Sequence, residues 1–144
     1  MQIKNEYIER IQMALQTAVH KMQPKMMESM NKHGVTATQF FVLMYLRKNE
    51  SCKISEIAEL MGVKPSAVSF MIDRLEHSNF VFREHDKKDR RVVNIKLSEE
   101  GVKKLELVVQ DRKAIFESSL FSLTDEELLQ FAKIAEKLAQ AVSK

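Results

Sequence analysis

Between residues 87 and 91 the sequence gathers four positive side chains around a single acid. They are Lys87, Lys88, Asp89, Arg90 and Arg91. The stretches on either side, 81–85 and 92–97, favour alternation of apolar and polar residues, which predicts a two-stranded hairpin with this cluster at its tip. Long cationic side chains at a hairpin tip can reach a phosphate backbone or a narrow minor groove of DNA. The alternative is a solvated turn that holds a few ion pairs.

A second group of candidate residues lies upstream, in a stretch with helical periodicity. Pro65 suits the first turn of a helix, where its missing amide hydrogen is not needed. The apolar residues that follow recur at i, i+3, i+4 and i+7, which fixes the inward face. They are Val68, Met71, Ile72 and Leu75. The outward positions are Ser66, Ser69, Phe70, Asp73 and His77. The spacing therefore predicts a helix over 65–77 whose outward face is a candidate for the major groove.

Five residues of this segment are candidate DNA contacts, each with a plainer alternative. They are Lys64, Ser66, Ser69, Phe70 and Arg74. Serine hydroxyls near a helix start can meet phosphates or base edges, although two exposed serines are also ordinary surface. An exposed Phe70 could contact a thymine methyl group, and burial against the hairpin is the alternative. Arg74 has Asp73, Glu76 and phosphate as possible partners. Lys64 is a phosphate candidate or simply a surface lysine.

The other reactive residue types form no catalytic or metal-binding pattern. The four histidines, His20, His33, His77 and His85, lack the spacing of metal ligands and have no partner cysteines. Gly-rich phosphate loops and nucleophile elbows are absent from the sequence, and its acids suit helix caps and solvated faces. The sequence therefore predicts a protein that is not an enzyme and binds no cofactor or metal.

These candidate residues must be positioned by a mainly helical chain. Thr36 with Gln39, and Thr124 with Glu127, have the spacing of capping boxes at helix starts. Pro24 lies within the first helical stripe and predicts a kink or a break there. Residues 49–53 are expected to be a connection. The expected helices cover the first thirty or so residues, about 37–47, 54–61, 65–77, 98–119 and the segment that follows Thr124.

The composition limits the fold class and the compartment. The chain has 144 residues, 44% of them hydrophobic, with only three Gly and two Pro, as expected for one mainly helical domain. A net charge of +3 permits a polyanionic partner without establishing one. A single cysteine, no membrane-length apolar run and no signal peptide predict a cytoplasmic protein with no membrane partner.

Two short helices joined by a turn and followed by a basic hairpin predict a winged helix-turn-helix. The long amphipathic stripes at both ends exceed what this small unit needs to cover its core, so we expect them to form a homodimer interface. The predicted organisation is an N-terminal dimerisation helix region (1–33), a DNA-binding lobe (34–98) and C-terminal dimerisation helices (99–144) in one compact chain. The fold class is mainly α with a small β-hairpin wing.

The ordered motifs of this segment resemble the MarR family of bacterial and archaeal transcription regulators. The resemblance covers roughly Thr36 to Leu105. The motifs that carry it are Thr36-x-x-Gln39-Phe40-x-x-Leu43, Ile57-Ala58-x-x-Met61-Gly62-Val63, Ile72-Asp73-Arg74-Leu75-Glu76, Asp86-x-x-Asp89-Arg90-Arg91 and Leu97-Ser98-Glu99-Glu100-Gly101.

The resemblance implies a homodimeric, sequence-specific DNA-binding regulator, a repressor that a small-molecule inducer releases from a pseudo-palindromic operator. Helix 65–77 would enter the major groove and wing 86–91 the minor groove, with Asp89 orienting Arg91. The alternative is a dimeric winged-helix module that binds proteins and has no specific DNA binding. The small charge of the outward face over 65–77 favours that alternative, whereas the four wing cations oppose it.

The sequence also departs from the family pattern. Phe70 stands where many members have an arginine that reads bases, so the usual sequence preference is not expected. Asn79 replaces a common glycine but tolerates the same left-handed backbone. Relatives that sense peroxide carry their cysteine in the first helix. Cys52 lies outside that helix, so a structural role is favoured.

Overall fold

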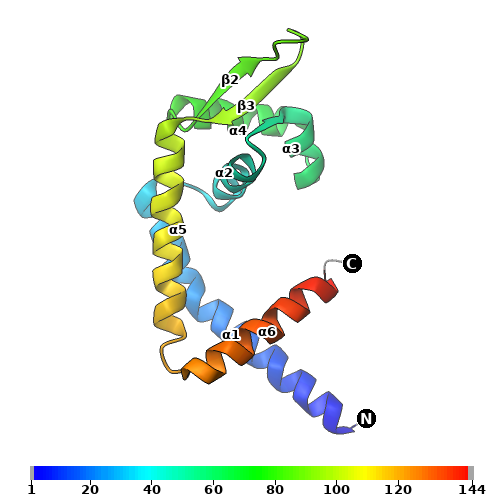
Figure 1. The fold of residues 1–144 in the computed structure, drawn as a ribbon, viewed down its shortest axis with the longest axis vertical. Helices are drawn as coiled ribbons and strands as arrows, with labels where there is room; N and C mark the ends of the chain where they lie inside the picture. The colour runs from blue at the N-terminus through cyan, green and yellow to red at the C-terminus, as the bar shows by residue number, and fades with distance from the viewer. Residues whose placement is uncertain (1, 143–144) are drawn as a thin grey trace.

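The computed structural model describes residues 2–142, which form six helices and three short strands (Figure 1). In chain order they are α1 (Gln2–His33), α2 (Ala37–Asn49), β1 (Ser51–Lys53), α3 (Ile54–Met61), α4 (Pro65–His77), β2 (Val81–His85), β3 (Val93–Leu97), α5 (Glu99–Ser119) and α6 (Asp125–Val142). Figure 1 shows a lobe at one end of the molecule, from which α1 and α5 extend to a region where α6 crosses α1. The mainly helical winged-helix prediction is confirmed.

The main core lies inside this lobe, because α2, α3 and α4 each turn an apolar side toward the sheet. Buried side chains from the lobe include Val42, Leu43, Leu46, Ile57, Val68, Ile72, Leu75 and Ile95. Helix α5 joins the same core through Leu105 and Val108, which are fully buried. Burial of such side chains supplies most of the folding free energy and holds the lobe and the start of α5 together.

The sheet has three antiparallel strands in the order β1-β3-β2. Ile95 at the centre of β3 lies opposite Cys52 on one side and Arg83 on the other. The predicted hairpin is confirmed, but the assignment of residues 49–53 to a connection alone was wrong. Strand β1 forms because Cys52 is buried beside Ile95, and its backbone then pairs with β3.

Local capping interactions set the helix boundaries. The Thr36 hydroxyl accepts a hydrogen bond from the Gln39 amide, and the Gln39 side chain accepts one from the Thr36 amide, both at 3.1 Å. Thr124 and Glu127 form the same reciprocal pair at 3.2 and 3.0 Å. Both predicted capping boxes are confirmed. Asn79 has φ of 64°, so it does adopt the left-handed conformation after α4.

Gly101 allows α5 to begin directly against the segment that joins α4 to β2. A Cβ atom at this position would lie 2.0 Å from the backbone oxygen of Phe80. That oxygen also accepts a hydrogen bond of 3.0 Å from the Ser98 amide. The close approach fixes α5 to the base of the wing.

Of the kink or break predicted at Pro24, the break does not occur, because helix α1 continues through this residue. In α3, Leu60 is about half exposed although it is apolar. At 100° per residue, Ile57, Ala58 and the half-buried Met61 complete the inward stripe of α3, which places Leu60 outside it.

Helices α1 and α6 leave a large apolar surface uncovered in the single chain. No residue of α6 is buried between Asp125 and Val142. Its apolar residues and those of α1 border an open cavity of about 390 Å³. The residues that line it are Ile11, Ala14, Leu15, Phe131, Ile134, Ala135 and Leu138. No helix of residues 2–142 is both long enough and apolar enough to span a membrane.

Candidate nucleic-acid interface

Helix α4 presents its candidate DNA contacts along one exposed side. Lys64 precedes the helix with extended backbone angles, and Pro65 occupies its first turn as predicted. Lys64, Ser66, Phe70 and Arg74 are exposed, whereas Ser69 is half-buried beside the inward stripe. The inward face holds Val68, Ile72 and Leu75, all of which are fully buried. The core therefore fixes which side chains of α4 face solvent.

Phe70 and Arg74 form a stacked pair on the exposed side of α4. The Phe70 side chain is 62% exposed, which settles the alternatives left open by its sequence in favour of exposure. The guanidinium carbon of Arg74 lies 5.0 Å from the centre of the Phe70 ring, within the range of a cation–π interaction. The two residues are one helical turn apart, so α4 itself brings them together.

Arg83 of β2 bridges the wing to α4. Its Nη2 donates a hydrogen bond to Asp73 Oδ1 at 2.6 Å, and its Nη1 donates one to Glu76 Oε1 at 2.8 Å. The hydrogen bond to Asp73, supported by the negative charge of Glu76, raises the pKa of Arg83. Asp73 and Glu76 thus pair with Arg83, and Arg74 stacks on Phe70 instead.

At the wing tip, Asp89 holds Arg91 through three hydrogen bonds. Its carboxylate accepts from the Arg91 backbone amide at 3.1 Å and from Nε and Nη2 of the same side chain at 3.1 and 3.2 Å. These bonds lower the pKa of Asp89, so its carboxylate is ionised at neutral pH. The Arg91 side chain is nevertheless 91% exposed. Asp89 therefore holds a guanidinium that projects into solvent.

The wing turn is also stabilised by hydrogen bonds that leave the side chains of Lys87, Lys88 and Arg90 unused. The Asp86 carboxylate accepts from the Lys88 amide at 2.8 Å, and His85 Nδ1 lies 2.9 Å from the Arg90 carbonyl oxygen. Lys87, Lys88 and Arg90 are exposed. In the part of the chain that the structure describes, no ion pair binds these three side chains. The alternative interpretation of this segment was a solvated turn whose cations form ion pairs within it. Of the four wing cations, only Arg91 forms such a pair in the described residues.

Comparison with known proteins agrees with this geometry. The sequence model of the MarR family matches residues 35–93. The HTH-type transcriptional repressor MdtR of Bacillus subtilis is 52% identical over 141 residues, which cover 98% of this chain and 91% of that protein. The chain belongs to the MarR family.

Solved structures of related proteins share the whole MarR-type fold. The crystal structure of the YusO protein from Bacillus subtilis is 52% identical, with a TM-score of 0.84, and the match covers 95% of this chain and 97% of that one. A MarR family protein from Bacillus stearothermophilus is 25% identical, with a TM-score of 0.86 over 97% of this chain and 98% of that one. MarR-family proteins are DNA-binding transcription regulators and not enzymes, so both predictions of class are confirmed.

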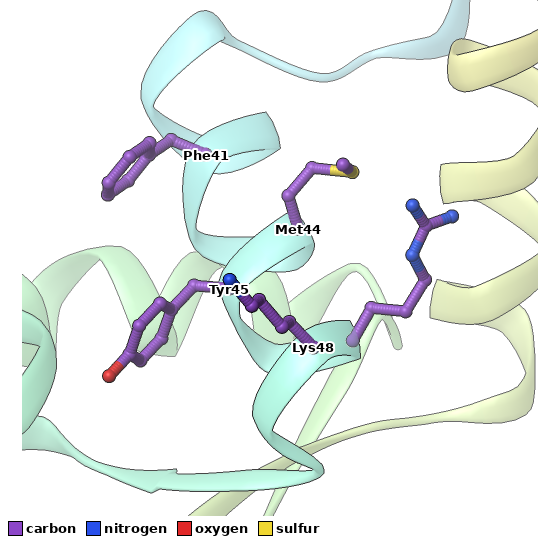
Figure 2. Close-up of a pocket in the computed structure, with 5 residues that line it drawn as sticks. Phe41, Met44, Tyr45 and Lys48 are labelled. Atoms are coloured by element: carbon purple, nitrogen blue, oxygen red, sulfur yellow. The ribbon is translucent and has the colours of Figure 1, made fainter. Parts of the chain in front are cut away.

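Helix α2 of this MarR-family chain borders a second feature, an open pocket of about 440 Å³. It is lined by Phe41, Met44, Tyr45, Arg47 and Lys48. Figure 2 shows Phe41 and Tyr45 projecting from the same side of the helix, one turn apart. The lining combines two aromatic rings with two cations and contains no acid.

A polar cluster joins α1 to α5 where both helices meet the lobe. The Asp111 carboxylate accepts a hydrogen bond from Ser29 at 3.0 Å and lies 2.8 Å from His33 Nε2. The hydrogen bond with His33, followed by that from Ser29, lowers the pKa of Asp111. Sequence inspection considered His33 only as a metal-ligand candidate and did not connect it with Ser29 or Asp111, because 78 to 82 positions separate Asp111 from its partners.

Cys52 is buried in β1, consistent with the structural role favoured from the sequence. Burial, followed by the nearby Glu56 carboxylate, raises the pKa of the Cys52 thiol to about 11. The reactive form of cysteine is the thiolate, which is scarce at neutral pH when the pKa is this high. Among residues 2–142 no group of three or more His, Cys, Asp or Glu side chains is placed to hold a metal ion.

The structure separates the predicted contacts into two groups, one on α4 and one on the wing. The residue that sequence reasoning missed is Arg83, which connects the two. A signal for it exists in the strand pattern, because Val81 is buried and Arg83 lies two residues further along β2 on the same face. That face meets α4, where Asp73 and Glu76 are spaced three residues apart.

Proposed function

We propose that the protein is a homodimeric, sequence-specific DNA-binding repressor that a small molecule releases from its operator. Helix α4 enters the major groove and wing 86–91 the minor groove of each half-site. The proposed contacts are Lys64, Ser66, Ser69, Phe70, Arg74, Lys87, Lys88, Arg90 and Arg91. The observation that carries this proposal is the exposed Arg91 side chain, which Asp89 holds at the wing tip.

The charge distribution of the wing supports binding to a polyanion. Lys87, Lys88, Arg90 and Arg91 are exposed, and only Arg91 is paired with an acid there. Each cation placed next to a phosphate releases condensed counterions, which makes binding favourable and dependent on salt. An arginine in the minor groove would also respond to groove width, so Arg91 contributes to sequence preference without reading base edges.

A second copy of the chain is the proposed cover for the apolar surface of α1 and α6. The exposed residues include Ile11, Leu15, Phe131, Ile134 and Leu138. These residues form the apolar stripes of two amphipathic helices, and such helices are stable only when another surface covers the stripe. A two-fold dimer would place the two α4 helices about one helical turn of DNA apart, as a pseudo-palindromic operator requires. Regions 1–33 and 99–144 would then form the dimer, and 34–98 the DNA-binding lobe.

The pocket on α2 is the proposed inducer site. Phe41 and Tyr45 can stack against an aromatic ring, while Arg47 and Lys48 favour a negative charge. An aromatic carboxylate combines both properties. A ligand at this position would affect the wing, because only Glu50 separates α2 from β1 of the sheet.

The test is fluorescence anisotropy of the purified protein with the DNA just upstream of its own gene, next to a shuffled duplex of the same composition. We expect tighter binding to the native duplex that persists at about 150 mM salt. Lys87→Ala should weaken binding to both duplexes and reduce the salt slope by about one for each wing. Lys113→Ala, which removes a lysine about three helical turns along α5 from Gly101 at the base of the wing, is the matched control and should change neither.

A dimeric protein-interaction module is the second candidate function. Asp73 and Glu76 neutralise Arg83 on one side of α4, which leaves that surface with little net positive charge. Equal, salt-sensitive binding to every duplex, including ones selected from a random pool, would support this module and contradict the repressor.

A further inference from the structure

The exposed side of α4 carries an aromatic ring and a guanidinium that are already arranged as one unit. Phe70 is 62% exposed, and Arg74 stacks over its ring at 5.0 Å. A cation–π contact of this kind uses the face of the guanidinium and leaves its edge N–H groups pointing outward. In residues 2–142 no acceptor binds these N–H groups. The unit therefore offers an apolar surface and a planar set of donors next to each other.

Arg83 binds the two acids of α4 that could otherwise form ion pairs with Arg74. Asp73 and Glu76 are the acids nearest to Arg74 along α4, and both bind Arg83 at 2.6 and 2.8 Å. Residues one or two apart on a helix do not face each other, and the bonds to Arg83 keep both carboxylates turned toward β2. Because Arg83 occupies both acids, Arg74 remains available for an external acceptor.

The external acceptors that match this unit are found in the major groove. A guanine presents O6 and N7 as two acceptors in one plane, which matches the two-pronged donation of an arginine. A thymine presents a C5-methyl group, which is an apolar contact for a phenyl ring. Residues four apart on a helix are about 6 Å apart along its axis, and stacked bases are about 3.4 Å apart, so adjacent base pairs lie within reach of the pair.

We infer that Phe70 and Arg74 together read a thymine next to a guanine in each half-site, Phe70 contacting the thymine methyl and Arg74 the O6 and N7 of guanine. This inference rests on the proposed DNA-binding function. It assigns base reading to two side chains of α4, whereas the wing cations and Lys64 contact the backbone or respond to groove shape. The competing assignment is that Arg74 binds a phosphate, which would give affinity without sequence preference.

The experiment begins with selection of preferred duplexes from a randomised pool by the full-length wild-type protein. Each thymine of the selected site is then replaced singly by deoxyuridine, which removes only the methyl group. Each guanine is replaced singly by 7-deazaguanine, which removes only the N7 acceptor. Dissociation constants are measured by anisotropy for the wild type, Phe70→Ala, Arg74→Ala and Lys64→Ala.

At one thymine of each half-site, we expect deoxyuridine to weaken wild-type binding about threefold to tenfold and to leave the Phe70→Ala affinity unchanged. At the neighbouring guanine, 7-deazaguanine should weaken the wild type about tenfold and leave Arg74→Ala unchanged. Lys64→Ala is the matched control, because Lys64 directly precedes α4 and is proposed to contact the DNA backbone. It should bind all duplexes more weakly and retain both base-specific penalties.

The possible failures are distinguishable. If the pool yields no preferred duplex, the proposed repressor function itself is wrong. If a preferred duplex is found but the deoxyuridine penalty is the same in the wild type and Phe70→Ala, the reading by Phe70 is refuted and the repressor function stands. If Arg74→Ala weakens every duplex equally and keeps the 7-deazaguanine penalty, Arg74 is a phosphate contact. Thermal unfolding of each variant confirms that the exposed substitutions leave the fold intact.

Discussion

Replacing Arg83 by methionine should remove the ion pairs that join the wing to α4 while keeping most of the side chain's volume. The substitution removes two ion pairs, with Asp73 and with Glu76, whose N–O distances are 2.6 and 2.8 Å. The side chains of both acids are well exposed, at 61% and 41%, so solvent screens each pair and each contributes only about 0.5 kcal/mol. The two acids would then also repel each other from positions three residues apart, which adds about 0.3 kcal/mol.

The expected loss of folding stability is therefore about 1 to 1.5 kcal/mol, or roughly 3 to 5 °C in Tm for a chain of this size. The effect on DNA binding should exceed the effect on folding stability for two reasons. An unpaired Asp73 in the proposed interface would repel phosphate, and Arg74 could turn toward the freed Asp73 carboxylate and away from DNA. We expect about a tenfold loss of affinity for the preferred duplex. Thermal unfolding and anisotropy, performed at one salt concentration, measure the two effects separately.

The double variant Arg83→Met with Asp73→Asn is the internal control. It lacks the bridge but has no unpaired acid at position 73, so it should recover most of the DNA affinity while its Tm stays low. Wild-type affinity in Arg83→Met alone would refute the role of Arg83 in positioning α4. An equally weak double variant would show that geometry, and not the charge of Asp73, determines the loss.

Three further substitutions or reagents test other parts of the molecule. Arg91→Ala should weaken binding to the preferred duplex by at least about 1 kcal/mol in anisotropy without changing Tm, because it removes an exposed contact and no core; an unchanged affinity would contradict the wing assignment. The pKa of Asp111 in the folded state lies below the usual 3.8. Ionised Asp111 therefore stabilises the fold fully above pH 3.8, and this stabilisation is lost as the pH falls through the lowered pKa. The stability difference between the wild type and Asp111→Asn in denaturant titrations should therefore be full near neutral pH and disappear in acid, and a difference that does not depend on pH would argue against the His33–Asp111 bond. Cys52, with a thiol pKa of about 11, should react with iodoacetamide at pH 8 only after denaturation, and rapid labelling of the native protein would disprove its burial.

Sequence patterns predicted those parts of the fold that depend on neighbours along the chain. The α4 stripe and both capping boxes involve residues three or four apart, and the spacing alone specifies them. Strand β1 was missed because three residues with one buried side chain, Cys52, give no periodic signal. Pairing with Ile95, more than forty residues away, creates the strand.

The site was predictable to the same degree. The wing cations stand out as a run, and the pairing of Asp89 with Arg91 follows the implied family pattern. The exposure of Phe70 could not be decided from sequence, because a ring at that position could equally have been covered by the hairpin. The bridge from Arg83 to Asp73 and Glu76 depends on how β2 crosses α4, which is a tertiary property.

The central position of β3 in the sheet has a mechanical consequence for the wing. β3 is hydrogen-bonded to β1 and to β2, so it is supported on both edges, whereas the segment from Asp86 to Val92 extends beyond this support. A two-stranded ribbon alone is only marginally stable, and the third strand supplies the missing stiffness. The wing is therefore supported by the sheet at its base, and its tip depends on the hydrogen bonds of its own turn. In the proposed complex with DNA, the charged tip would adjust to the local width of the groove while the base of the sheet stays in place.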